Sequence, residues 1–168
     1  MPDDSLARLA ALAGSRLKAA GAMLVTAESC TGGWVAQEVT GIAGSSDWFE
    51  RGFVTYSNAA KQDLLGVSPD TLERFGAVSE QTAREMASGA MRAAAGTVTL
   101  AVTGIAGPGG GSVDKPVGTV CFAWAGPGTA LRAETRCFAG DRESVRRQAV
   151  IRALEGLIEA LDGASGRV

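Results

Sequence analysis

The chain has 168 residues, a length typical of one domain, and a nearly balanced net charge of −2 without any histidine. It has no basic run and few aromatic residues, which argues against nucleic-acid binding through cationic patches and stacking rings. It also lacks a signal-peptide pattern and an apolar run of about 18 residues, so we expect no membrane partner and a cytoplasmic protein. The odd number of cysteines, without C-x-x-C spacing, disfavours a disulfide framework or a zinc site. We expect neither a metal nor another cofactor.

The amino-terminal part of the chain alternates between helical and strand-like patterns. Apolar residues at helical spacing precede Gly21, and the run that follows is apolar on successive residues, as in a strand buried on both faces. Serines and a proline mark helix starts further along. In chain order, we expect a helix before Gly21, a strand over 22–27, a helix over 34–39, a strand over 53–56, a helix carrying Lys61, a helix from Ser68 to Gly76, and a helix from Ser79 to Ala95.

The carboxyl-terminal part predicts a hairpin and a long helix. A strand over 98–103 runs into the glycine-rich segment 104–111, and two strands over 117–125 and 130–138 flank a Gly-Pro-Gly turn. Asp141 is expected to cap the last helix, with a flexible tail over 163–168. Alternating strands and helices with one hairpin predict a single domain over 1–162, a three-layer α/β/α sandwich on a mixed sheet.

A serine and a cysteine stand where the first strand ends and a helix begins. Gly32 and Gly33 allow a tight turn, and N–H groups at a helix start favour negative charge, so Ser29 is a candidate nucleophile beside an oxyanion site. Ser29 could instead be only a helix cap. Cys30 is the rival nucleophile, but buried cysteines are commonly inert, and we expect only one of two adjacent residues to face a site. We favour Ser29.

Lys61 is the candidate base. Without histidine, the base must be a lysine, a carboxylate or a tyrosine, and the lysines are few. Lys18 fits a surface helix, and the S-x-x-K sequence ending at Lys115 lies between glycines and a proline, where a helix is improbable. A lysine just after the second strand would lie at the same sheet edge as Ser29, and partial burial would lower its pKa. The alternative is an ordinary solvated helix charge.

Other residues near that edge are candidates for substrate binding. The 104–111 segment lacks the Lys-Ser/Thr of a P-loop, and it is either a backbone nest for an anion or a plain surface loop. The arginines that open the last helix could clamp a phosphate, or pair with Asp141 or Glu143. Tyr56 and Asn58 lie near the same edge and could hydrogen-bond a substrate, and packing and helix capping are their alternative roles. The candidate set is Tyr56, Asn58, Thr103, Gly104, Ala106, Gly107, Arg142 and Arg146.

Six ordered segments resemble the CinA C-terminal domain family over residues 5–160. They are Thr26-Ala-Glu-Ser-Cys-Thr-Gly-Gly33, Gly52-Phe-Val-Thr-Tyr-Ser-Asn58, Gly76-Ala-Val-Ser79, Thr103-Gly-Ile-Ala-Gly-Pro108, Lys115-Pro-Val-Gly-Thr119 and Gly140-Asp-Arg142. The resemblance implies an α/β/α sandwich on a mixed, mostly parallel sheet with one antiparallel strand. Stand-alone members convert nicotinamide mononucleotide to nicotinate mononucleotide and ammonia in pyridine-nucleotide recycling. The partner domain of two-domain members is absent from this sequence, which favours that activity.

The resemblance also assigns roles to residues. Ser29 and Lys61 match the family's Ser/Lys pair, which implies an acyl-enzyme mechanism. The backbone groups expected to hold the oxyanion are those of Cys30, Thr31, Gly32 and Gly33. The implied partner is a small nucleotide substrate, and we also expect a homo-oligomer. The alternative function is a non-catalytic nucleotide-binding or regulatory module of the competence and damage-inducible family.

Overall fold

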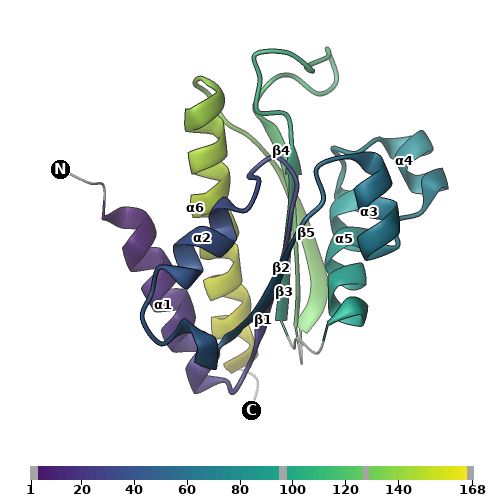
Figure 1. Ribbon diagram of the computed structural model, residues 1–168. Coiled ribbons are helices and arrows are strands. Elements are labelled where there is room, and N and C mark those ends of the chain that lie inside the picture. The colour runs from purple at the N-terminus through teal and green to yellow at the C-terminus, as the bar shows by residue number, and fades with distance from the viewer. Residues whose placement is uncertain (1–3, 95–97, 127–128, 166–168) are drawn as a thin grey trace.

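The computed structural model describes residues 4–94, 98–126 and 129–165. Within these ranges the chain forms a five-stranded sheet with helices on both faces (Figure 1). The elements, in chain order, are α1 (Ser5–Ala19), β1 (Leu24–Glu28), α2 (Trp34–Thr40), the 3-10 turn η1 (Ser45–Asp47), β2 (Phe49–Val54), α3 (Asn58–Leu65), α4 (Pro69–Phe75), α5 (Glu80–Ala93), β3 (Val98–Gly104), β4 (Thr119–Gly126), β5 (Thr129–Cys137) and α6 (Arg142–Ser165).

The sheet is mixed, as the sequence predicted. Its strand order is β2-β1-β3-β4-β5. β1 pairs in parallel with β2 and with β3, whereas β4 is antiparallel to both β3 and β5. Only β4 therefore runs against the other described strands, and the expected hairpin of β4 and β5 is confirmed, although residues 127 and 128 at its tip lie outside the described residues.

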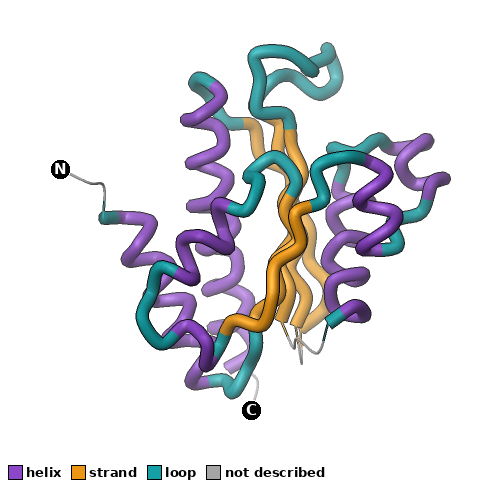
Figure 2. The backbone as a smooth tube through the Cα atoms, in the orientation of Figure 1, coloured by secondary structure: helices purple, strands orange, loops and turns teal. Residues whose placement is uncertain are grey.

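Helices cover the sheet in two layers, which makes the three-layer sandwich. α1, α2 and α6 lie on one face, and α3, α4 and α5 lie on the other (Figures 1 and 2). The side chains of β1 alternate between two hydrophobic clusters, because successive residues of a strand point to opposite faces. Leu24 joins the cluster under α1 and α6, and Val25 joins the cluster under α5. All of β1 is buried, as its continuous apolar run predicted.

The helix that carries Lys61 lies directly against α5. A Cβ atom built on Gly89 of α5 would meet the carbonyl oxygen of Leu65 at 1.8 Å, so only a glycine allows this approach. Leu65 is the last residue of α3. The close contact therefore sets the position of α3, and of its lysine, relative to the sheet.

The boundaries of β2, of α6 and of the domain can be compared with those expected from the sequence. β2 begins at Phe49 rather than Phe53, because pairing with β1 holds Arg51 and Gly52 in a strand that their polarity and flexibility do not predict. α6 continues through Gly163 to Ser165, where we expected the start of a flexible tail. Ala95 and residues 166–168 lie outside the described residues, and the domain boundary at residue 162 stays a prediction. Among the helices described, none combines the length and apolar character needed to cross a bilayer.

Candidate active site

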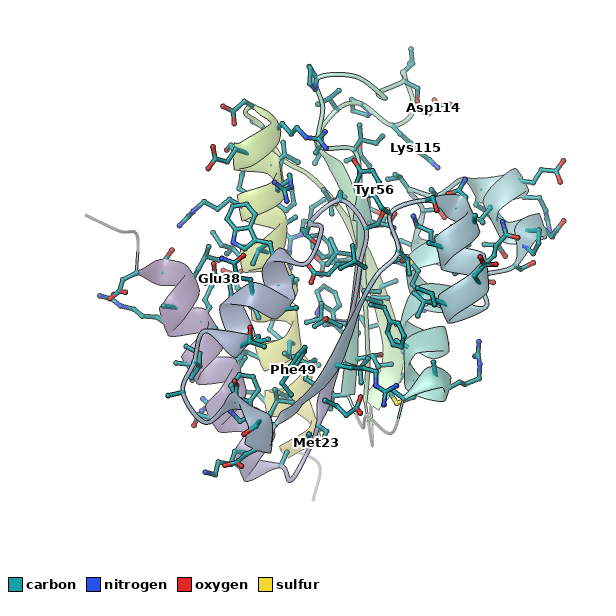
Figure 3. All side chains as sticks on the ribbon, viewed as in Figure 1. Met23, Glu38, Phe49, Tyr56, Asp114 and Lys115 are labelled. Atoms are coloured by element: carbon teal, nitrogen blue, oxygen red, sulfur yellow. The ribbon has the colours of Figure 1, made fainter. Side chains whose placement is uncertain are left out.

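The carboxyl ends of β1, β2 and β3 meet at one edge of the sheet, and a cavity of about 250 Å³ opens there. Tyr56 and Lys115 lie at this end of the molecule, and Met23 lies at the opposite end (Figure 3). Ligands in open α/β sheets bind at the carboxyl ends of strands. The cavity is therefore the candidate site, and its position agrees with the sequence prediction.

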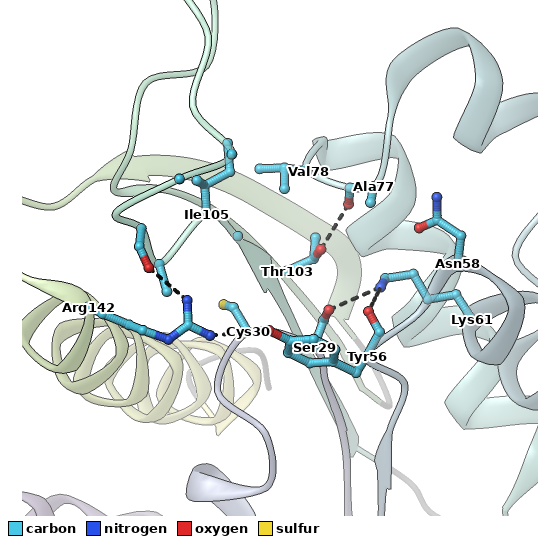
Figure 4. A pocket seen from close by; sticks show the side chains of 15 residues that line it. Ser29, Cys30, Tyr56, Asn58, Lys61, Ala77, Val78, Thr103, Ile105 and Arg142 are labelled. Carbon is cyan, nitrogen blue, oxygen red and sulfur yellow. Dashed lines mark hydrogen bonds between the residues drawn. The ribbon is translucent and has the colours of Figure 1, made fainter.

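Three chain segments supply most of the cavity wall (Figure 4). They are the residues after β1, the residues after β2 with the start of α3, and the end of β3 with the glycine-rich loop that follows it, and the connection between α4 and α5 adds Ala77 and Val78. Ala77, Val78, Ile105, Gly109 and Gly110 were not among the predicted site residues. The segment from Gly76 to Ser79 carried a signal, because it is one of the six family-like segments, but its apolar residues suggested no role. The lining residues are Ser29, Cys30, Tyr56, Asn58, Lys61, Ala77, Val78, Thr103, Gly104, Ile105, Ala106, Gly107, Gly109, Gly110 and Arg142.

Lys61 and Ser29 are in direct contact inside this cavity. The Nζ atom of Lys61 donates to the Oγ atom of Ser29 at 3.0 Å and to the carbonyl oxygens of Thr55 and Tyr56 at 3.0 and 3.2 Å. Ser29 is 7% exposed and Lys61 is 1% exposed. Within the part of the chain that the structure describes, no carboxylate forms an ion pair with this amine.

The surroundings of Lys61 favour its neutral form. Burial removes the ammonium from water and lowers the pKa of Lys61 below its ordinary value of 10.5. A neutral amine keeps its N–H bonds for the two carbonyl oxygens, and its lone pair is then left for the Ser29 hydroxyl. The contacts can thus direct the serine proton toward nitrogen.

Cys30 lines the same cavity, so the expectation that only one of the two adjacent residues faces the site is wrong. The protonation state of the thiol distinguishes Cys30 from Ser29 instead. Burial raises the pKa of the Cys30 thiol to about 12, with a smaller contribution in the same direction from the charge of Glu28. The thiol stays protonated near neutral pH, and a thiol is a far poorer nucleophile than a thiolate. Ser29 therefore stays the better candidate nucleophile.

The turn after β1 has its own hydrogen bonds. Gly32 and Gly33 adopt φ angles of +59° and +99°, which explains the glycine pair. The N–H of Ser29 donates to Val102 in β3, and the N–H of Gly32 donates to the carbonyl of Ser29. Gly32 is thereby removed from the set of free oxyanion donors. Among the described residues, the N–H groups of Cys30, Thr31 and Gly33 donate to no oxygen.

Glu28 does not line the cavity but contacts the turn that carries Ser29, and the sequence analysis assigned it no role. Its carboxylate is fully buried and accepts hydrogen bonds from the Thr31 hydroxyl at 2.6 Å and from the N–H groups of Val35 and Ala36 at 2.9 and 3.1 Å. These amides begin α2, so the helix start that we expected to hold an incoming negative charge already holds one. The sequence feature that could have drawn attention to Glu28 was an acidic residue at the end of a strand predicted to be buried on both faces.

Arg142 bridges the mouth of the cavity. Its guanidinium donates to the carbonyl of Gly107 at 2.7 Å and to the Tyr56 hydroxyl at 3.2 Å (Figure 4). The Thr103 hydroxyl donates to the carbonyl of Ala77 at 2.8 Å, which ties the α4–α5 connection to β3. Asn58 lines the cavity wall at the start of α3. The cap of this helix is the preceding residue, Ser57, whose hydroxyl accepts from the N–H of Ala60.

Arg146 does not line the cavity, in contrast to its predicted role in substrate binding. Its guanidinium donates to the carbonyl oxygens of Cys30 and Thr31 at 3.0 and 3.1 Å and lies over the ring of Trp34. Arg146 follows Arg142 by one turn of α6, and the two side chains bind different groups. Arg146 supports the serine turn from outside the cavity.

The described residues offer no group of three metal-binding side chains. The S-x-x-K sequence ending at Lys115 is not helical, as its flanking glycines and proline predicted, and the Nζ atom of Lys115 donates to the carbonyl of Phe75.

A serine hydroxyl in contact with a buried lysine amine, at the carboxyl edge of an α/β/α sheet, has the form of a nucleophile with its base. The fold and site thus define a class of α/β proteins with a serine and a buried lysine in contact at the carboxyl edge of the sheet. Residues 6–161 match the CinA C-terminal domain family, and the chain belongs to that family.

Similar proteins cover nearly the whole chain. Nicotinamide-nucleotide amidohydrolase PncC of Escherichia coli is 56% identical over 160 residues, which span 94% of this chain and 95% of that protein. The protein of the same name from Pseudomonas putida is 49% identical, over 93% and 97% of the two chains. The crystal structure of competence/damage inducible protein CihA from Agrobacterium tumefaciens superposes with a TM-score of 0.91 at 46% identity, covering 96% of this chain and 98% of that one.

Proposed function

We propose that this protein hydrolyses the carboxamide of nicotinamide mononucleotide to nicotinate mononucleotide and ammonia, as a step in the recycling of pyridine nucleotides. The observation that carries the proposal is the 3.0 Å contact between Lys61 and Ser29 in a cavity at the strand ends. Two relatives that span nearly this whole chain are named nicotinamide-nucleotide amidohydrolases, which supports the choice of substrate.

The first half of the reaction forms an acyl-enzyme. Neutral Lys61 takes the hydroxyl proton as the Oγ atom of Ser29 attacks the carboxamide carbon. The carbonyl oxygen becomes an oxyanion, and we assign the N–H groups of Cys30 and Thr31, which donate to no oxygen among the described residues, as its backbone donors. When the tetrahedral intermediate collapses, the C–N bond breaks and protonated Lys61 delivers its proton to the departing ammonia.

The second half releases the acid. Water attacks the ester carbon, Lys61 again accepts a proton, and the C–O bond to Ser29 breaks as the proton returns to its Oγ atom. Nicotinate mononucleotide leaves, and the enzyme returns to its starting state with a neutral amine. Every proton transfer in the cycle uses the same nitrogen, which agrees with the absence of histidine from the sequence.

The phosphate and ribose of the substrate are assigned to the side of the cavity formed by Arg142, Tyr56 and the loop at Gly107. The guanidinium supplies positive charge at the mouth, and the glycines allow close approach of a ligand to the backbone. Arg146 is left out of this binding set, because it already holds two carbonyl oxygens. The cytoplasmic location and the homo-oligomer stay predictions.

The test measures ammonia release from nicotinamide mononucleotide by purified protein, with free nicotinamide as the control substrate. We expect release from the nucleotide and little from the free amide. Ser29→Ala should abolish release while retaining nucleotide binding, and Cys30→Ala should stay active. The reverse result for the two variants would overturn the assignment of the nucleophile. No release from the nucleotide by the wild-type protein would favour the non-catalytic binding module.

A further inference from the structure

Two charged side chains that do not line the cavity hold the serine turn, one from the end of β1 and one from α6. Glu28 holds it at the start of α2 through the Thr31 hydroxyl and two backbone amides. Arg146, which is 116 residues away from Cys30 in the sequence, holds it from α6 through the carbonyl oxygens of Cys30 and Thr31. The turn between these anchors carries Ser29 and the N–H groups that follow it.

These contacts determine which way the peptide groups face. In a trans peptide the carbonyl of one residue and the N–H of the next point in opposite directions. The only cis peptide among the described residues follows Gly107, so the turn is trans throughout. Because Arg146 holds the Cys30 carbonyl, the Thr31 N–H must point away from Arg146. The Ser29 carbonyl accepts from Gly32 within the turn, which directs the Cys30 N–H out of the turn.

The turn needs such anchors because of its composition. Gly32 and Gly33 have positive φ angles and no side chain to restrict rotation of the neighbouring peptides. A flipped peptide would replace an N–H donor by a carbonyl oxygen and would repel an oxyanion. Such a flip would weaken the stabilisation of the transition state. It would leave ground-state binding of the nucleotide intact, because neither Glu28 nor Arg146 lines the cavity.

We propose that Glu28 and Arg146 are positioning residues that clamp the serine turn, so that the N–H groups of Cys30 and Thr31 are preorganised toward the oxygen of the reacting carbonyl. The assignment of the reaction rests on the proposed function. The clamp itself concerns any electrophile that Ser29 attacks, so it can be tested with and without the nucleotide.

The first test compares kcat and KM for ammonia release in Arg146→Lys and Glu28→Gln. Lysine keeps the charge but lacks the planar fork in which two separate nitrogens, Nε and Nη2, donate to the two carbonyl oxygens, and glutamine keeps the shape but replaces one acceptor by a donor. Matched controls are Arg74→Lys and Glu73→Gln, both on the exposed surface of α4.

Loss of an oxyanion donor costs about 10²–10³ in kcat, and misplacing donors should cost less, so we expect a fall of about 10- to 100-fold in kcat with KM within about threefold. The controls should keep wild-type values. Unchanged kcat per folded molecule in Arg146→Lys, or a change in KM alone, would overturn the clamp. Because Glu28 is buried, Glu28→Gln could fail to fold, and Arg146→Lys then decides the outcome.

The second test uses a fluorophosphonate, which needs no amide substrate. The Oγ atom of Ser29 forms a P–O bond as the P–F bond breaks, fluoride leaves, the hydroxyl proton passes to Lys61, and the phosphoryl oxygen occupies the oxyanion position. We expect slower labelling of Ser29 in both clamp variants, and partial recovery of Arg146→Ala by guanidinium below denaturing concentrations. Equal labelling rates in wild type and Arg146→Lys would overturn the inference.

This second test separates the clamp from the proposed function. A wild-type protein that is labelled by the probe but releases no ammonia from nicotinamide mononucleotide would end the proposed function, and the labelling rates would still decide the clamp. A wild-type protein that reacts with neither compound would overturn both.

Discussion

The Nζ atom of Lys61 lies 3.0 Å from the Oγ atom of Ser29, although the two residues are 32 positions apart in the sequence. Parallel pairing of β1 with β2 brings them together, since each residue follows the carboxyl end of its strand. The carbonyl oxygens of Thr55 and Tyr56 hold the amine from the other side. The serine is thus in contact with a lysine amine that is buried and held in place by backbone groups.

Replacing the amine should remove the activity with little change in the fold. We expect Lys61→Met to lower kcat by about 10²–10⁴-fold, the usual contribution of a general base, and Ser29→Ala combined with Lys61→Met to be no worse than Ser29→Ala alone. Burying a thioether in place of an amine favours stability, and the loss of a donor to two carbonyl oxygens opposes it, so Tm should move by only a few degrees. Steady-state kinetics and thermal unfolding measure both. A variant with kcat within tenfold of wild type would contradict the assigned base.

The rate of hydrolysis should depend on pH in one direction. The reaction needs neutral Lys61, whose pKa lies below 10.5, so kcat/KM should be low at acidic pH and should rise through a single ionisation below 10.5. A pH–rate profile with nicotinamide mononucleotide measures this. A profile that is flat, or that falls as the pH rises across the neutral range, would contradict the role of the amine.

The same lysine should make the free energy of unfolding depend on pH. Its pKa is lowered in the folded state, so between the folded pKa and the unfolded value near 10.5 the unfolded chain binds more protons. Stability contributed through Lys61 therefore rises as the pH increases through this window. Urea unfolding of wild type and Lys61→Met at several pH values isolates the effect, and their difference should shift in favour of wild type at higher pH. A constant difference would argue against the lowered pKa.

Arg142 should matter for phosphorylated substrates in particular. Charge-assisted hydrogen bonds contribute about 1.5–3 kcal/mol, so Arg142→Ala should raise KM for nicotinamide mononucleotide about 10- to 100-fold. The nucleoside without the phosphate should be much less affected. Arg136→Ala, on the exposed side of β5, is the matched control. Equal losses for nucleotide and nucleoside would place the phosphate elsewhere.

Two helical glycines should respond in opposite ways to alanine. Gly89→Ala places a Cβ atom against the Leu65 carbonyl and should cost about 1–3 kcal/mol by overpacking, with a loss of activity because α3 carries Lys61. Gly163 has open space around it, and Gly163→Ala should be neutral or stabilising by up to about 1 kcal/mol. Thermal unfolding distinguishes them, since each kcal/mol corresponds to about 2–4 °C in a protein of this size. Equal stability of the two variants would contradict the close contact between α3 and α5.

The parts of the site that follow a strand or begin a helix were predictable. Ser29 directly follows β1, Thr103 lies near the end of β3, and Lys61 lies on the first helix after β2. Strand pattern and topology therefore place the three residues at one edge of the sheet. The hairpin of β4 and β5 was predictable from a Gly-Pro-Gly turn between two strand patterns. Each of these inferences depends on local propensity and on a general rule of sheet topology.

Other features depended on contacts that local patterns do not encode. Arg142 and Arg146 have the same residue type and neighbouring positions, yet one lines the cavity and the other binds the serine turn from outside. Ala77 and Val78 line the cavity only because the α4–α5 connection is tied to Thr103. Glu28 looked like the polar end of a strand until its hydrogen bonds to α2 were seen.

The sequence by itself determined the alternation of strands and helices, the glycine turn after the first strand, and the restriction of any base to a lysine, a carboxylate or a tyrosine in a chain without histidine. The tertiary structure alone decided the burial of Lys61, the direction of its hydrogen bonds and the orientation of the turn's peptide groups. The physical reason is that helix and strand patterns repeat over a few residues and can be read locally. The direction of a long side chain, and the environment that shifts its pKa, depend on atoms contributed by distant segments.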